Sequence, residues 1–246
     1  MKINNKTALV TGAGSGIGYE IAKLLKEQGN DVIIIGRNAE KIKAAGETLG
    51  VTALVCDVTK EADIEALVEK ISSEFPALSV LINNAGVANL YKLGEGADAY
   101  HKAKHEFEVN YFGPVLLTEK MLPVLQQQPE AAIVNITSNV TFHPLVVLPT
   151  YSDTKAALHS HTVALRHTLA KDTSIKIYEV MPSLVNTDAT RDMGGENGMH
   201  PRVVAEATLS GISNEQYEIY VGDTSVQRAA YFADPIAAVE SFNKGL

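Results

Sequence analysis

The sequence predicts an α/β protein in which a doubly wound, seven-stranded parallel sheet lies between two layers of helices. Short apolar runs alternate with amphipathic segments along most of the chain, and the first run leads into a cluster of glycines. Continuous apolar runs are typical of strands that are buried on both faces, and strands that alternate with helices favour a parallel sheet. With 246 residues, 46% of them hydrophobic, and no low-complexity linker, residues 1–246 are expected to form one domain.

Composition and charge exclude several classes of function. The formal net charge of -8, without any cluster of Lys and Arg, argues against nucleic-acid binding. The single cysteine, Cys56, excludes an intrachain disulfide and a metal site built from cysteines, and no metal site is expected. The N-terminus lacks the long apolar region of a signal peptide, and no apolar run reaches membrane-spanning length. A cytoplasmic protein without membrane contact is therefore expected.

The first strand, Thr7–Thr11, runs into the loop Gly12-Ala-Gly-Ser-Gly-Ile-Gly18, after which apolar residues recur with helical spacing. Glycines let a backbone approach a ligand closely, and a helix N-terminus offers unpaired N–H groups to a pyrophosphate. Such a loop between a strand and a helix predicts nucleotide binding, with an ordinary glycine-rich turn as the alternative.

The second strand, Asp31–Arg37, ends where the adenosine ribose of a dinucleotide would lie. An acidic residue there would accept hydrogen bonds from a free ribose 2′-hydroxyl, whereas an arginine pairs with a 2′-phosphate. Arg37 therefore favours NADP(H) as the cofactor, with NAD(H) also possible. The alternative is an arginine that is merely solvated.

The third and fourth strands, residues 52–57 and 78–82, each end in residues suited to the same ligand. Asp57 is placed to accept from the adenine amino group, or else to cap the helix predicted at 61–74. Asn83-Asn84-Ala85-Gly86 follows the fourth strand, and its small residues leave space for a cofactor. Asn and Gly also favour ordinary turns, which is the alternative interpretation.

A long helical segment, residues 98–127, contains Pro114 in its middle. Proline has no N–H to offer the carbonyl of Asn110, four residues earlier, so that carbonyl requires another partner. One hypothesis is a water held by Asn110 and shared with Lys155. The other is a plain kink.

The fifth strand, residues 131–136, leads to Ser138, and ligands of open α/β sheets bind outside the carboxyl ends of the strands. The apolar loop that follows, residues 140–149, is expected to pack against another chain or to line a pocket for an apolar substrate. His143 in this loop is expected to be structural.

Tyr151 and Lys155 lie four residues apart in a helix predicted at 150–171, so their side chains share one face. A fixed positive charge favours the phenolate and is expected to lower the pKa of Tyr151 toward working pH. Tyr151 is then a candidate general acid and base. Taken alone, the spacing also fits a half-exposed helix face.

The sixth strand, residues 175–180, is followed by Thr187, which is placed to hold a carboxamide or to cap the next segment. A glycine-rich stretch at 190–201 and a short helix at 202–210 predict a small substrate lid around residues 188–212. Alternation at 215–221 predicts the seventh strand. The tail beyond it carries no strong signal.

Together, these residues resemble the short-chain dehydrogenase/reductase family over nearly the whole chain. The motifs are Thr11–Gly18, Asn83–Gly86, Asn110, Ser138 and Tyr151 with Lys155, in that order. The resemblance implies a Rossmann-type fold, a nicotinamide cofactor and a catalytic tetrad of Asn110, Ser138, Tyr151 and Lys155. The implied cofactor-binding residues are Gly12, Gly14, Ser15, Gly16, Ile17, Gly18, Arg37, Asp57, Val58, Asn84, Ala85, Gly86, Tyr151, Lys155, Pro182, Val185 and Thr187.

Within the family, the stretches Pro149–Lys155 and Tyr217–Gly222 resemble the DltE-type oxidoreductases associated with bacterial D-alanylation gene clusters. One departure is Pro182-Ser183, where many members of the family have Pro-Gly.

The resulting hypothesis is an oxidoreductase that transfers a hydride between NADP(H) and a small carbonyl or alcohol substrate. Tyr151 acts as the general acid or base, and Ser138 bonds the substrate oxygen. The alternatives are a dehydratase or epimerase that retains its cofactor, and a non-enzymatic NADP-sensing protein. A homodimer or homotetramer is expected.

Overall fold

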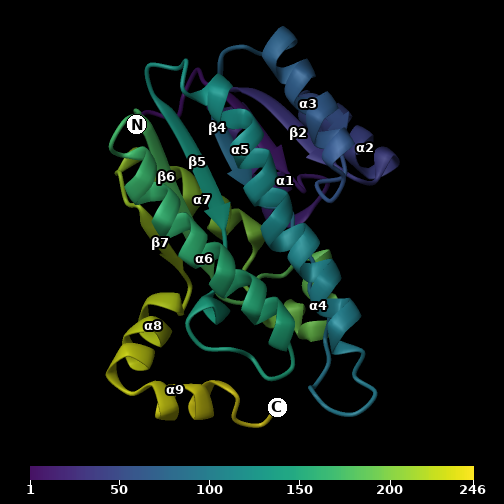
Figure 1. Ribbon diagram of the computed structural model, residues 1–246, viewed down its shortest axis with the longest axis vertical. Helices are drawn as coiled ribbons and strands as arrows, with labels where there is room; N and C mark the ends of the chain where they lie inside the picture. The colour runs from purple at the N-terminus through teal and green to yellow at the C-terminus, as the bar shows by residue number, and fades with distance from the viewer.

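The computed structural model describes residues 1–246 and contains one sheet of seven strands, all parallel, in the order β3-β2-β1-β4-β5-β6-β7 (Figure 1). The chain starts in the middle of the sheet, builds outward to β3, and then crosses back to β4 beside β1. This is the doubly wound topology, so the predicted fold class is confirmed. The strands are β1 Thr7–Thr11, β2 Asp31–Gly36, β3 Thr52–Val55, β4 Leu78–Asn83, β5 Ala131–Ile136, β6 Ile175–Pro182 and β7 Glu218–Val221.

Helices cover both faces of the sheet and give three layers. One core lies between the sheet and the helices α1 Gly16–Glu27, α2 Ala39–Leu49 and α7 Pro201–Ser213. The other lies under α3 Glu61–Glu74, α5 Gly113–Leu125 and α6 Pro149–Leu169. Successive residues of β1 enter opposite cores, with Ala8 and Val10 on one face and Leu9 on the other. No helix has the combination of length and apolarity that a membrane span requires.

The strand boundaries differ from prediction at several ends. β2 stops at Gly36, and β3 stops at Val55, so Arg37 and Asp57 both lie in loops beyond the sheet. β7 begins at Glu218 because Glu215 adopts a φ of 56° and Gln216 donates to Gly211, which closes α7 with a turn. Positive φ is incompatible with an extended strand.

The long helix predicted at 98–127 is divided in two. α4, Ala99–Phe107, and α5 are joined by a π-helical turn at Glu108–Phe112, in which Gly113 N–H bonds the Glu108 carbonyl five residues earlier. The wider turn accommodates Pro114 at the start of α5, where a missing N–H is least costly. The interruption that the sequence predicts is therefore a π turn, and it contains Asn110.

Two helices, α8 Thr224–Ala233 and α9 Pro235–Phe242, occupy the tail that carries no strong signal in the sequence (Figure 1). They extend beyond the end of the sheet and hold the apolar loop 140–149. Asn243 accepts from Val146 N–H at 2.8 Å and donates to the Pro144 carbonyl at 3.0 Å. His143 is buried with its ring 4.3 Å from that of Phe242, in agreement with the structural role expected for it.

Candidate active site

The glycine loop lies at the carboxyl edge of the sheet against the residues that follow β4. Gly12 has a φ of 65°, and a Cβ there would lie 2.8 Å from Ala85 Cα. A Cβ at Gly18 would lie 2.5 Å from Asn84 Nδ2. The backbone therefore approaches the second loop more closely than any side chain would permit.

Thr11 joins these two loops. Its Oγ1 accepts from the N–H groups of both Asn84 and Ala85 at 2.9 Å, and Asn84 Nδ2 donates back to the Thr11 carbonyl at 2.9 Å. Thr11 was not predicted as a site residue. The indication in the sequence is a hydroxyl side chain at the last position of a buried strand.

The other residues of the first loop have separate places. Ser15 is the N-cap of α1, and Ile17 packs against the core. Gly14 faces α2, where a Cβ would lie 3.2 Å from Lys41 Cγ. The start of α1 is thus bordered by a cationic side chain that the sequence analysis did not single out.

One pocket brings together Gly12, Arg37, Asp57, Val58 and Ala85, all of them predicted cofactor residues. Its remaining lining residues are Ile35, Gly36, Cys56, Val87 and Val109. Arg37 forms no ion pair and no side-chain hydrogen bond with the protein. An unpaired guanidinium at such a pocket is suited to an anionic ligand group.

Asp57 supports the turn before α3. Its Oδ1 accepts from Thr59 N–H at 3.1 Å and from Thr59 Oγ1 at 2.8 Å. Although burial acts to raise it, the pKa of Asp57 is lowered because of these hydrogen bonds and the positive charges of Lys60 and Arg37. Asp57 does not cap α3, the predicted alternative, because the N-cap of that helix is Lys60 and Asp57 closes the turn before it. A contact with adenine stays a prediction.

Asn110 ties the loop after β4 to α6. Its Oδ1 accepts from Val87 N–H at 2.8 Å, and its Nδ2 donates to the Val87 carbonyl at 2.8 Å and to Thr154 Oγ1 at 3.0 Å. A Cβ at Gly86 would lie 3.5 Å from Asn110 Oδ1 and 3.7 Å from Lys155 Nζ. Asn110 and Lys155 therefore both border Gly86, and a shared water at this point stays a prediction.

Lys155 is buried on α6 with its Nζ donating to the Ile136 carbonyl at 2.9 Å. The same Nζ lies 5.5 Å from the centre of the Tyr151 ring. Burial lowers the pKa of Lys155 to about 8, against the opposing influence of the Glu179 carboxylate. The two residues of the predicted pair do converge on one site.

The pKa of Tyr151 moves opposite to the predicted direction. Burial raises it to about 12, the Ser138 hydroxyl acts to lower it, and Glu106 raises it further. The prediction of a lowered pKa is wrong for this arrangement because desolvation of the phenol outweighs the neighbouring hydroxyl. Spacing along a helix says nothing about how deeply the hydroxyl is desolvated.

Ser138 precedes a short 3-10 turn, Asn139–Thr141, at the end of β5. Its Oγ donates to Asn139 Oδ1 at 2.9 Å, and Asn139 Nδ2 donates to Gln227 Oε1 of α8 at 2.9 Å. The tail helix therefore reaches the residue that adjoins Ser138. Sequence reasoning missed Asn139 and Gln227, and no signal in the sequence connects residues 88 positions apart.

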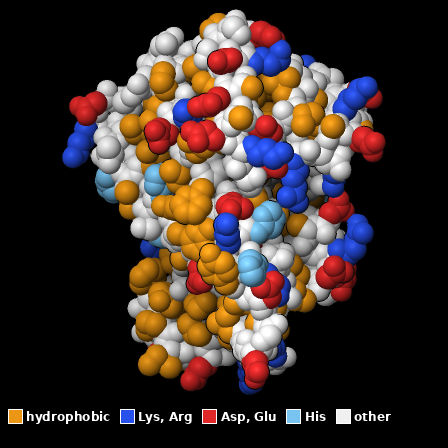
Figure 2. Space-filling view, turned by 45° about the vertical axis from the view of Figure 1, so that its right-hand side comes forward, with side chains coloured by type: hydrophobic (Ala, Val, Ile, Leu, Met, Phe, Trp, Pro, Cys, Tyr) orange, Lys and Arg blue, Asp and Glu red, His pale blue; other side chains and the backbone are white.

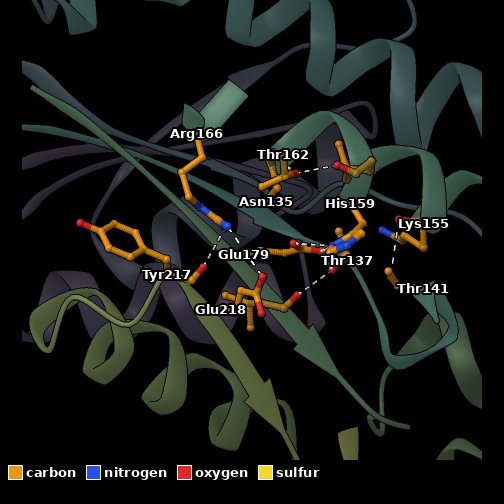
Figure 3. A network of polar contacts seen from close by, with 12 residues as sticks. Asn135, Thr137, Thr141, Lys155, His159, Thr162, Arg166, Glu179, Tyr217 and Glu218 are labelled. Carbon is orange, nitrogen blue, oxygen red and sulfur yellow. Dashed lines mark hydrogen bonds and ion pairs between the residues drawn. The ribbon is translucent and has the colours of Figure 1, made fainter. Parts of the chain in front are cut away.

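A buried acid lies behind Lys155 (Figure 3). Glu179 on β6 is fully buried, and it accepts from Thr137 Oγ1 at 2.7 Å and pairs with His159 Nδ1 at 2.9 Å. Figure 3 shows His159 and Thr137 pointing to this carboxylate, with Lys155 on the same side of it. Glu179 was not predicted as a site residue, although the sequence shows a carboxylate inside an otherwise apolar strand.

The segment after β6 faces the glycine loop. A second pocket is lined by Ser15, Gly16, Asn186, Thr187, Asp188, Arg191, Glu196 and Pro201. Pro182 ends β6, the Val185 side chain is buried in the core, and Thr187 pairs with Thr190 as the alternative capping role predicts. Asp188 bonds Lys41 Nζ of α2 at 2.8 Å.

The predicted lid includes part of the core. Residues 201–213 form α7, whose Val204 and Leu209 are buried against the sheet. A movable lid therefore stays a prediction for the residues between Thr187 and α7.

Comparisons with known proteins identify the family. The model of the short chain dehydrogenase family matches residues 6–197. The uncharacterized oxidoreductase DltE of Bacillus subtilis is 41% identical over 224 residues, which are 91% of this chain and 85% of that protein.

Two solved structures share the fold. A short-chain dehydrogenase/reductase from Burkholderia phymatum in complex with NAD has a TM-score of 0.89 and 22% identity, covering 96% of both chains. A short-chain dehydrogenase from Burkholderia cenocepacia in complex with NADP has a TM-score of 0.86 and 26% identity, covering 98% of both chains. With the family model matching most of the sequence, the chain belongs to the short-chain dehydrogenase/reductase family of oxidoreductases, in its DltE-like branch.

Proposed function

We propose that the protein is an NADP(H)-dependent carbonyl reductase in which Tyr151 is the general acid. The observation that carries this proposal is the convergence of Ser138, Tyr151 and Lys155 at the carboxyl edge of the sheet, beside Gly86. A hydroxyl, a phenol and an ammonium around one point are suited to neutralising an oxyanion and supplying it with a proton.

The residues present fit a dinucleotide. Gly12 and Gly18 let the first loop pack directly against Ala85 and Asn84, and the neighbouring pocket presents the unpaired Arg37. Gly12, Ser15 and Gly16 would border the pyrophosphate at the start of α1, and Arg37 would pair with a 2′-phosphate. When bound, the nicotinamide cofactor supplies the hydride. The complexes of the two structurally similar proteins with NAD and NADP support a nicotinamide nucleotide as the cofactor.

Each catalytic side chain has a distinct task in the proposal. Ser138 donates a hydrogen bond to the substrate oxygen, where negative charge grows in the transition state. Tyr151 gives that oxygen its proton. Lys155, held by the Ile136 carbonyl, carries a positive charge beside Tyr151 and favours its phenolate once the proton has left. Asn110 holds the loop that contains Gly86 in place.

The first test is a parallel titration of the protein with NADPH and NADH, followed by nicotinamide fluorescence, which the absence of tryptophan makes convenient. Tight NADPH and weak NADH binding are expected. Preference for NADH would overturn the cofactor assignment, and binding of neither would overturn the enzymatic proposal.

The second test concerns the chemistry. NADPH consumption is measured with a panel of apolar ketones and aldehydes for the parent protein and for Tyr151→Phe. Loss of a general acid is expected to lower turnover roughly 100- to 10,000-fold while NADPH binding is retained. Substrate conversion without net consumption of NADPH would indicate a dehydratase or epimerase instead. Nearly normal turnover of Tyr151→Phe would exclude this acid.

We also propose that the protein forms a dimer or tetramer. Tyr100 and Phe112 near the π turn are exposed, as are Val226, Phe232 and Ile236 of the tail helices. Figure 2 shows hydrophobic side chains gathered toward the lower end of the molecule, where Figure 1 places α8 and α9. Burial of this apolar area would favour association. Light scattering at micromolar concentration tests this, and a monomeric mass would contradict it.

A further inference from the structure

The Ser138 hydroxyl is the first member of a hydrogen-bond chain that runs out of the site to the tail. Ser138 Oγ donates to Asn139 Oδ1, and Asn139 Nδ2 donates to Gln227 Oε1, each at 2.9 Å. Ser138 and Asn139 are buried, and Gln227 is half-buried on α8. A substrate oxygen or the Tyr151 phenolate needs the hydrogen that Ser138 gives here to Asn139.

This conflict follows from the number of hydrogens available. A serine hydroxyl has one hydrogen and can donate to one partner at a time, whereas it can accept from two. With Asn139 Oδ1 facing Ser138, that hydrogen goes to Asn139, and Val140 N–H is a distant donor to the same oxygen at 3.4 Å. Ser138 in this orientation is an acceptor toward the reacting atoms. The lowering effect of Ser138 on the pKa of Tyr151 requires the other direction, in which the hydroxyl donates to the phenol oxygen.

Reversal of the two amides removes the conflict. With Asn139 Nδ2 turned to Ser138 and Gln227 Nε2 donating to Asn139 Oδ1, both hydrogen bonds of the chain are kept with opposite polarity. Ser138 then accepts from Asn139, and its own hydrogen is free. The two polarities have the same number of hydrogen bonds within the chain, and the second leaves the Ser138 hydrogen for a reacting oxygen to accept.

We propose that the amide pair Asn139–Gln227 sets the direction of the Ser138 hydroxyl and so decides whether Ser138 donates to the reacting oxygen. Gln227 is thereby a positioning residue on a helix outside the sheet. The catalytic part of this inference rests on the proposed reductase function.

α8 is held where this role requires it. Thr224 at its start is buried and bonds the Val221 carbonyl at the end of β7. The guanidinium of Arg228, next to Gln227, lies 5.5 Å from the ring of Phe142 and 4.8 Å from that of Phe232. These contacts join the helix to the loop that follows Asn139, so that Gln227 keeps its distance to the amide.

Two substitutions force opposite polarities. Gln227→Glu offers only acceptors, which keeps Asn139 Nδ2 on α8 and the Ser138 hydrogen engaged. The side chain introduced by Gln227→Lys offers only donors, so Asn139 turns its Oδ1 toward α8 and its Nδ2 toward Ser138. The hydrogen of the Ser138 hydroxyl is then free. We expect kcat to be about tenfold higher for Gln227→Lys than for Gln227→Glu, the effect of one hydrogen bond, with little change in KM.

The effect of charge alone is controlled at Ser225, an exposed position two residues before Gln227 on the same helix. Ser225→Glu and Ser225→Lys carry the same charges without reaching Asn139, and their kcat values are expected to be equal. A difference at Ser225 as large as that at Gln227 would overturn the proposal. The same two Gln227 substitutions are also made together with Asn139→Ala, which removes the amide between Gln227 and Ser138. If kcat still differs as much between them there, the proposal is overturned.

A second readout needs no substrate. The phenolate of Tyr151 is titrated by its ultraviolet absorbance, with the spectrum of the Tyr151→Phe variant subtracted. The pKa of Tyr151 is expected to be lower in Gln227→Lys than in Gln227→Glu by more than the difference between the Ser225 controls, since a free Ser138 hydrogen stabilises the phenolate. If no carbonyl is reduced by the parent, the proposed function fails and this titration still decides the polarity. Equal pKa values in the two Gln227 variants would overturn the polarity proposal alone.

Discussion

His159 and Glu179 form an acid-base pair directly behind Lys155, with His159 Nδ1 2.9 Å from Glu179 Oε2. The carboxylate is fully buried, whereas the imidazole retains some contact with solvent. This hydrogen bond raises the pKa of His159 above its ordinary value of 6.5, although burial opposes the shift. The protonated imidazole therefore stabilises the folded state.

The stability of the fold should consequently depend on pH through His159. The stabilisation is fully present below about pH 6.5 and is lost as the pH rises through the raised pKa of the folded state. In urea unfolding, the free energy of unfolding of the parent should exceed that of His159→Gln by on the order of 1 kcal/mol at about pH 6. The difference should be smaller at about pH 9. His167→Gln on the exposed face of α6 is the control. Equal differences at both pH values would show that the pair does not titrate as argued.

Glu179 should also influence the protonation of Lys155. Its negative charge raises the pKa of Lys155, which burial has lowered to about 8. Glu179→Gln removes that charge, so Lys155 should lose its proton at lower pH. The alkaline limb of the pH profile of kcat/KM should therefore move to lower pH. Glu218→Gln, at the Cα partner of Glu179 on β7, is the matched control and should leave that limb in place. An unmoved limb in Glu179→Gln would contradict the coupling.

Arg37 should decide between the two nucleotides. A charged hydrogen bond to the 2′-phosphate is worth about 1.5–3 kcal/mol, so Arg37→Gln should weaken NADPH binding about 10- to 100-fold and leave NADH binding unchanged. Arg191→Gln is the control, since Arg191 lines the other pocket and is already bonded to Asp188. An equal loss of affinity for both nucleotides would mean that Arg37 supports the pocket and does not select the phosphate.

Gly18 should tolerate no side chain. A Cβ there would lie 2.5 Å from Asn84 Nδ2 and 2.9 Å from the Gly12 carbonyl oxygen. Gly18→Ala should therefore destabilise the fold by about 1–3 kcal/mol and weaken binding of both nucleotides. At Gly94 nothing lies within 4 Å of a Cβ, so Gly94→Ala serves as the control. Thermal unfolding and the fluorescence titration measure the two effects, and a neutral Gly18→Ala would contradict the close approach.

The sheet, and the edge of it at which the site lies, can be predicted from the sequence alone. Continuous apolar runs specify buried strands, and the loop from Gly12 to Gly18 specifies a close backbone approach at the end of the first of them. The spacing of Tyr151 and Lys155 placed their side chains on one helix face. These are local properties, so neighbouring residues suffice to express them.

The charge of the site and the contacts that hold it depend on the folded chain as a whole. The direction of the Tyr151 pKa shift depends on desolvation by segments from several parts of the chain. Glu179 meets His159 across a strand and a helix, and Gln227 reaches Asn139 from a tail without sequence signal. Desolvation and long-range hydrogen bonds depend on what the whole fold places around a group, which no local spacing contains.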